Sequence, residues 1–214
     1  GGDPVTWTRG ILPGIQGGIG YVDAERGHDE SGYGGSWSTP FKTLSYALVT
    51  GSATAGVKAI WVRAGTYTGT GSEVVALRSG LSLYGGFIGN ERGLNERDLA
   101  AGNASIIDGQ NARRCVTGAN NAVLDGFTLI RGASYCGGGV YCNGTAPIIR
   151  NCMIMNNVAT SLGGGVHCES TPTIAPIISN CVIANNSSPD RGGGVYVEMN
   201  ALCEVSFCTI AKNT

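Results

Sequence analysis

Asn151-Cys-Met-Ile-Met-Asn-Asn157 and Asn180-Cys-Val-Ile-Ala-Asn-Asn186 are two copies of one sequence pattern. Phe207-Cys-Thr-Ile-Ala-Lys-Asn213 is a further copy, and Gly126-Phe-Thr-Leu-Ile-Arg-Gly132 fits the same frame one step earlier. The copies follow one another at steps of 25, 29 and 27 residues. A period of this length without a helical pattern is typical of a solenoid built from short strands.

Each copy alternates between two kinds of residue, as a short strand with one buried face does. The apolar positions expected to point inward are Phe127, Leu129, Cys152, Ile154, Cys181, Ile183, Cys208 and Ile210. The positions expected to point outward are Thr128, Met153, Val182 and Thr209. Glycine and asparagine replace each other on either side of the strand, which is typical of left-handed turn positions. These predicted turn positions are Gly126, Asn151, Asn180, Asn157, Asn186 and Asn213.

A second motif, Gly-Gly-Gly-Val, keeps pace with the strands. It occurs at Gly137–Val140, Gly163–Val166 and Gly192–Val195, at steps of 26 and 29 residues. We therefore expect an all-β solenoid in which equivalent strands of successive coils stack in parallel register, so that like residues form ladders.

The composition agrees with this fold class and excludes others. The chain of 214 residues contains 36 glycines, 42% hydrophobic residues and only 14% charged residues. A helical bundle would not tolerate so much glycine, and a disordered chain would be less apolar. A formal net charge of −1 without basic clusters argues against nucleic-acid binding. No apolar stretch reaches the ~18 residues of a transmembrane helix.

The first half of the chain reads as a cap followed by the opening coils. Residues 1–20 are expected to form a flexible arm or pairing segment, and residues 21–214 one β-helix domain with clear repeats over about 115–214. A capping helix is expected over about 38–50, with Ser38 or Thr39 as its N-cap and Gly51 at its end. Its apolar face would consist of Phe41, Leu44, Ala47 and Leu48.

Four short motifs carry a family resemblance: Tyr21-Val-Asp, Gly35-Ser-Trp, Pro40-Phe-Lys-Thr-Leu and Ile60-Trp-Val-Arg-Ala-Gly-Thr-Tyr67. They resemble the opening of right-handed parallel β-helix proteins of the pectate-lyase-like superfamily. Tyr84-Gly-Gly-Phe-Ile-Gly-Asn-Glu91 and Asn95-Glu-Arg-Asp98 resemble a bacterial surface subset of these proteins, and the Gly-Gly-Gly-Val repeats resemble those of polymorphic outer-membrane protein adhesins. The resemblance implies a right-handed parallel β-helix, a fold that hosts lyases, hydrolases and adhesins alike.

The eight cysteines are predicted to be structural, either as packed thiols or as disulfides: Cys115, Cys136, Cys142, Cys152, Cys168, Cys181, Cys203 and Cys208. Cys152, Cys181 and Cys208 share one coil position; Cys142 and Cys168 share another, which Cys115 is expected to open. Parallel stacking leaves Cβ atoms near ~4.8 Å, beyond the preferred ~3.5–4.5 Å of a disulfide, so the pairing stays open. A zinc site is disfavoured because no Cys-x-x-Cys pair is present.

Candidate acid–base residues are scattered along the coils: Asp108, Arg113, Arg114, Asp125, Arg131 and Arg150. Their expected role is local, and Asp125 reads as a turn residue. Glu169 and Glu198 occupy near-equivalent positions on successive coils and could form a carboxylate pair, although a solvated edge is the simpler reading. His28 is expected in a polar loop.

The candidate binding residues are Tyr141, His167 and Tyr196. Each is the second residue after a glycine triplet. If the preceding valines point inward, these three rings point outward and stack. Such a ladder either recognises a sugar or partner protein or stabilises the parallel sheet by stacking alone.

The sequence thus favours an extracellular or cell-surface structural or adhesive module, since cysteine-rich chains belong to oxidising compartments. Its expected partners are other copies of itself, stacked end to end into a filament, or surface glycans; no cofactor or metal is expected. The repeat stops at Thr214 without a capping sequence. Either another copy covers this open end, which would build a filament, or the chain is a fragment of a longer protein. The alternatives are a polysaccharide lyase or hydrolase and a glycan-binding module.

Overall fold

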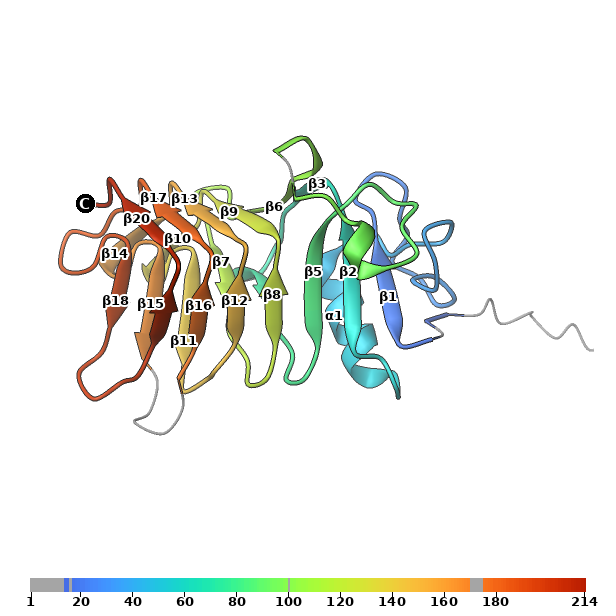
Figure 1. Ribbon diagram of the computed structural model, residues 1–214, viewed down its shortest axis with the longest axis horizontal. Helices are drawn as coiled ribbons and strands as arrows, with labels where there is room; N and C mark the ends of the chain where they lie inside the picture. The colour runs from blue at the N-terminus through green and yellow to red at the C-terminus, as the bar shows by residue number, and fades with distance from the viewer. Residues whose placement is uncertain (1–13, 16, 100, 170–174) are drawn as a thin grey trace, which may run out of the picture.

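The computed structural model describes residues 14–15, 17–99, 101–169 and 175–214. Most of the predicted arm lies outside the described residues, but Ile19 and Gly20 already belong to the first strand. Within the described part of the chain, the strands form three long parallel sheets and one short pair (Figure 1). The coils follow one another along the long axis of the molecule, which confirms the predicted parallel β-helix (Figure 1).

The first sheet contains seven strands in spatial order: β1 (Ile19–Val22), β2 (Ala59–Arg63), β5 (Ser82–Phe87), β8 (Val123–Asp125), β12 (Ile148–Arg150), β16 (Ile177–Ser179) and β19 (Glu204–Ser206). The second sheet contains six: β3 (Gly65–Tyr67), β6 (Ser105–Asp108), β9 (Phe127–Ile130), β13 (Met153–Met155), β17 (Val182–Ala184) and β20 (Thr209–Ala211). The third contains five: β4 (Glu73–Ala76), β7 (Arg114–Thr117), β11 (Val140–Asn143), β15 (Val166–Glu169) and β18 (Val195–Val197). The short pair is β10 (Ala133–Cys136) and β14 (Val158–Leu162).

The repeat strands present the faces that their alternation predicts. Leu129, Ile154 and Ile183 are fully buried, and they align in register across β9, β13 and β17. The positions predicted to point outward are at least partly exposed: Thr128, Met153, Val182 and Thr209. The Met153 side chain is 44% accessible to solvent. One continuous core therefore runs through the stacked coils.

The capping helix exists but begins later than predicted. Helix α1 spans Leu44–Ala53, with Thr43 as its N-cap, instead of about 38–50. Phe41 explains the difference, because its backbone bridges to Val22 and its N–H donates to the Tyr21 carbonyl, which holds it in an extended conformation. Gly51 lies inside the helix rather than at its end. A Cβ atom on Gly51 would lie 2.9 Å from Ile60 Cδ1. The predicted apolar face is buried as expected.

Two short 3₁₀ helices, η1 (Leu94–Glu96) and η2 (Ala101–Asn103), lie in the long connection between β5 and β6. This connection lies across the outside of the first coils (Figure 1). It brings Arg97 and Leu99 to the solenoid surface.

The turn positions are only partly as predicted. Gly126, Asn151 and Asn180 have positive φ values of 81°, 53° and 51°, and Phe207 continues this series at 54°. After the strand, however, the left-handed residue comes one position earlier than expected, at Arg131, Asn156, Asn185 and Lys212. Asn157, Asn186 and Asn213 do not adopt positive φ, so that part of the prediction is corrected.

Asn157, Asn186 and Asn213 instead form a hydrogen-bonded ladder inside the solenoid. The Asn186 amide oxygen accepts from the backbone N–H and side-chain amide of Asn157, both at 3.0 Å, and Asn186 repeats both contacts with Asn213. Asn157 and Asn186 are fully buried. A buried amide is stable only when its donors and acceptors are paired, and stacking supplies the partners from the neighbouring coil.

Candidate functional site

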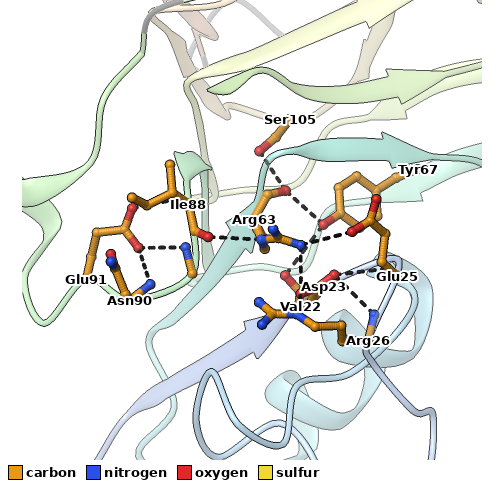
Figure 2. Close-up of polar contacts among 11 residues, drawn as sticks. Val22, Asp23, Glu25, Arg26, Arg63, Tyr67, Ile88, Asn90, Glu91 and Ser105 are labelled. Atoms are coloured by element: carbon orange, nitrogen blue, oxygen red, sulfur yellow. Dashed lines mark hydrogen bonds and ion pairs between the residues drawn. The ribbon is translucent and has the colours of Figure 1, made fainter. Parts of the chain in front are cut away.

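A network of polar side chains links the first three strands of the first sheet (Figure 2). The buried Asp23 carboxylate accepts hydrogen bonds from the Glu25 and Arg26 backbone N–H groups, from Arg26 Nε at 2.7 Å and from Arg63 Nη1 at 3.2 Å. Arg63 Nε also donates to the Ile88 carbonyl, at 2.9 Å. Arg63, at the end of β2, thus connects the chain after β1 to the chain after β5.

The Glu91 carboxylate closes the turn after β5 (Figure 2). It accepts from the backbone N–H groups of Ile88, Gly89 and Asn90 at 2.6, 2.9 and 3.0 Å. Trp37 donates its indole N–H to the Glu91 carbonyl at 3.1 Å. These are residues of the motifs that carry the family resemblance, and their geometry gives them a structural role in holding the opening coils together.

Asp125 has a similar environment at the end of β8. Its buried carboxylate accepts from Arg97 Nη2 and Arg150 Nε, both at 2.7 Å, and from the Asn151 amide at 2.9 Å. Burial acts to raise the pKa of Asp125, but these three hydrogen bonds outweigh it and the net pKa is lowered. Asp125 is therefore not only the turn residue predicted from sequence. Its contacts hold an ionised carboxylate in place and give it a structural role.

The remaining acid–base candidates are also engaged locally. Asp108 is ion-paired with Arg131, and Arg113 donates to the Gly71 carbonyl at 3.2 Å. Burial acts to raise the pKa of Asp108, but the hydrogen bonds from Arg131 and from the Gln110 backbone lower it overall. The structure does not bring these residues together into one site.

The outer face of the third sheet does bring the candidate binding side chains together. Tyr141, His167 and Tyr196 align in register on β11, β15 and β18, while the valines before them pair on the inner side. Neighbouring ring centroids are 5.3 Å apart, with the rings tilted by 34° and 51°. The predicted aromatic stack, which we call the ring ladder (Tyr141, His167 and Tyr196), is thus present.

His167 is the unusual member of the ring ladder. Its side chain is only 2% exposed, and neither ring nitrogen has a hydrogen-bond partner. The nearest charged group is Glu198, whose carboxylate oxygen lies 3.4 Å from Nε2. Burial lowers the pKa of His167, and Glu198 and Glu169 oppose this shift without overcoming it. A buried imidazole with unpaired nitrogens is costly, and this distinguishes it from the satisfied networks of the first coils.

Charged side chains surround the ring ladder. Tyr141 donates its hydroxyl to the Glu169 carboxylate, and burial followed by this bond raises its pKa to about 12. On the other side, the Arg114 guanidinium lies 4.4 Å from the centre of the Tyr141 ring and donates to the Cys136 carbonyl at 2.7 Å. Glu198 follows Tyr196 by two residues, as Glu169 follows His167, so both carboxylates project outward from adjacent strands.

The same sheet face continues to a cleft beside the capping helix. This cleft of about 710 Å³ is lined by Asp29 and Tyr46 on one side and by Glu73, Ala76 and Arg78 on the other. Ala76 pairs with Thr117, and Thr117 pairs with Tyr141, so one outward column runs from the cleft to the ring ladder. Glu73 accepts from the Thr117 hydroxyl at 3.5 Å along this column.

The chain matches a family described as "Protein of unknown function (DUF1565)" over residues 26–214. It belongs to the DUF1565 family. The stacked parallel strands are compatible with that family. Neither the curated proteins nor the solved structures contain a significant match to the chain.

In this DUF1565 chain the eight cysteines are free thiols, and six of them are buried. Cys142 and Cys168 stack in register, as predicted, and Val197 follows them. Cys115 does not open this column, because Val116 pairs with Val140 and the position opposite Cys142 is therefore Gly118. A Cβ atom on Gly118 would lie 3.3 Å from the Cys142 sulfur.

Across the residues that the structure describes, no three His, Cys, Asp or Glu side chains are grouped so that they could hold a metal ion. None of the helices in the described ranges has the length and apolar character needed to cross a membrane.

The sequence predicted the ring ladder but not its full environment. Glu169 and Glu198 are predicted as a carboxylate pair but not as neighbours of the ring ladder, although the repeat frame places each of them two positions after a ring. The Arg114–Tyr141 contact carries no sequence signal, because it depends on a long side chain that reaches the neighbouring coil. His28 packs against Tyr33 in the loop before the helix, with ring centroids 4.9 Å apart, far from these residues in sequence.

Proposed function

We propose that the chain is an extracellular, adhesive β-solenoid module that binds carbohydrate on the outer face of its third sheet. The ring ladder carries this proposal. Aromatic rings pack against the apolar faces of sugars, while carboxylates and guanidinium groups bind their hydroxyls. Tyr141 and Tyr196 supply the partly exposed rings, the buried His167 fills the space between them, and Arg114, Glu169 and Glu198 supply the polar groups beside them.

The carbohydrate-binding proposal is tested with a glycan array followed by calorimetry on the best ligand. Tyr196→Ala should weaken binding by about tenfold or more, because it removes a partly exposed ring from the contact surface. Tyr135→Ala is the matched control: Tyr135 is 72% exposed but lies on β10, outside the ring ladder. Equal binding by wild type and Tyr196→Ala, or no glycan bound at all, would reject the proposal.

A polysaccharide-cleaving enzyme is the second candidate, because Glu169 and Glu198 project from adjacent strands beside a buried histidine. Parallel strands lie ~4.8 Å apart, close to the ~5–5.5 Å between the two carboxyl groups of a retaining glycosidase. Release of reducing ends or of unsaturated uronates from a polysaccharide panel, abolished by Glu198→Gln, would favour this function. Binding without any product would favour the adhesive module.

Assembly into a filament is the further element of this proposal. Strands β18, β19 and β20 each pair on one side only among the described residues, and Phe207 and Ile210 are 88% and 51% exposed there. A second copy of this chain, stacked end to end, would pair these edges and cover this surface. Fibres in electron micrographs and a rising mass in light scattering are the expected results; a monodisperse monomer with no fibres would exclude assembly.

A further inference from the structure

Cys168 and Cys203 approach each other more closely than the repeat requires. The Cys168 sulfur lies 3.1 Å from the Cys203 sulfur. Cys168 is fully buried on β15 in the third sheet, whereas Cys203 is half-buried and precedes β19 in the first sheet. The two side chains therefore reach the contact from different walls of the solenoid, and their sulfurs converge.

The cysteine ladder (Cys152, Cys181 and Cys208) shows the opposite arrangement. Each of its thiols donates to the carbonyl of the residue two positions earlier: Cys152 to Arg150 at 3.2 Å, Cys181 to Ser179 at 3.2 Å and Cys208 to Ser206 at 3.3 Å. The repeated contact shows that the three side chains point the same way on successive strands. Parallel Cβ vectors about 4.8 Å apart do not favour a disulfide, so the cysteine ladder is suited to remain reduced.

We infer that Cys168 and Cys203 are an oxidation site of this chain and form its disulfide bond, a role distinct from the proposed carbohydrate-binding face. The oxidant is a small disulfide such as oxidised glutathione. The Cys203 thiolate, on the accessible side, attacks this disulfide and releases one glutathione thiolate. The Cys168 thiolate then attacks the Cys203 sulfur and releases the second. Two protein thiols are oxidised to one disulfide, two electrons reduce the oxidant to two glutathione thiolates, and the two protons given up by the protein thiols convert these to thiols.

The bond would close a loop that contains β16, β17 and β18, because its two cysteines lie 35 residues apart. It would join the last described coil covalently to the one before it. Closing a loop of this size raises the thermal midpoint by about 10 °C in a chain of this length.

The test maps thiols in the full-length chain. The folded protein is incubated with oxidised glutathione, denatured, alkylated with iodoacetamide and digested for mass spectrometry. We expect one cross-linked peptide pair containing Cys168 and Cys203, alkylation of the other six cysteines, and a higher melting temperature than that of the reduced chain.

Two variants complete the test. Cys203→Ser should leave all remaining cysteines alkylated and abolish the rise in melting temperature. Cys181→Ser removes a thiol from the cysteine ladder and should still yield the Cys168–Cys203 pair. Alkylation of all eight cysteines in the oxidant-treated wild type, a cross-link of Cys168 to its in-register neighbour Cys142, or a cross-link within the cysteine ladder would overturn the inference. The wild-type map decides even if a variant does not fold.

Discussion

The opening coils and the repeat coils share one backbone architecture but are held together in different ways. In the opening coils, charged residues such as Asp23 and Arg63 bridge segments that are far apart in sequence, and Asp125 does the same where these coils meet the repeat coils. In the repeat coils, Asn157, Asn186 and Asn213 make the same contact with each neighbour. A parallel solenoid can thus be stabilised by individual ion pairs or by ladders, and the two solutions respond differently to pH and to substitution.

The largest expected difference is the response to acid. Asp23, Asp108 and Asp125 each have a pKa below the ordinary value, because hydrogen bonds and arginines outweigh burial. A carboxyl whose folded pKa is depressed stabilises the fold above its unfolded pKa of about 3.9, and this contribution is lost as pH falls through the folded pKa. Melting temperature should therefore decline slightly as pH falls through about 6.5, because the lowered pKa of buried His167 lets the unfolded chain bind a proton first, and should drop steeply below about pH 4.

Hydrogen exchange locates this acid effect. Amides of β2 and β5 should lose protection before those of β13 and β17, because the asparagine ladder carries no titratable group. Simultaneous loss of protection along the whole solenoid would show that the two regions unfold as one unit.

Removal of one charged anchor should have the next largest effect. Asp125→Ala leaves Arg97 and Arg150 without their shared carboxylate partner. Breaking a buried ion pair on one side costs about 3–5 kcal/mol of unfolding free energy, which urea denaturation measures. Asp190→Ala is the control, because exposed Asp190 accepts from the Ser161 hydroxyl and forms no ion pair with the described residues; it should cost less than about 1 kcal/mol.

The asparagine ladder should show a gradient along the coils. Asn186→Ala leaves the backbone N–H and one side-chain amide hydrogen of the buried Asn157 unpaired and should cost about 2–4 kcal/mol. Asn213→Ala removes the equivalent acceptor from Asn186 at a less buried position, and about 1–2 kcal/mol is expected. Equal losses in urea denaturation would mean that burial does not set the strength of the ladder.

The smallest expected effect is a gain. Phe207 has a φ of 54° and is 88% exposed, so it is strained and packs against little. Phe207→Gly should stabilise the fold by about 0.5–1 kcal/mol, since glycine adopts this conformation without a Cβ clash. Asn180→Gly at the equivalent turn should change stability less, because asparagine tolerates positive φ.

These regions also differ in how far the sequence predicts them. The repeat predicted the strands, their inner faces and the ring ladder, because each observation recurs in several copies. The left-handed residues after each strand lie one position earlier than the repeat predicts, since the Asn157 side chain serves as a buried donor and not as a turn residue.

The opening coils contain no repeated sequence pattern from which their contacts could be predicted. The contact between Asp23 and Arg63 joins residues 40 positions apart and occurs once, so no spacing indicates it. The start of α1 was misplaced for the same reason, because it depends on the pairing of Phe41 with Val22. The thiols of Cys168 and Cys203, which lie in different sheets, likewise become neighbours only after folding.

The glycine triplets have a consequence for how such a chain can change. A Cβ atom at Gly138, Gly164 or Gly193 would collide with a backbone carbonyl of the following coil, so the chain turns this corner without side chains. Each coil also presents its successor with the same pattern of donors and acceptors as its predecessor did. A whole period is therefore the natural unit of insertion or deletion, and a solenoid of this kind can be lengthened or shortened by complete coils, whereas loss of a single residue at the corner would disturb every ladder beyond it.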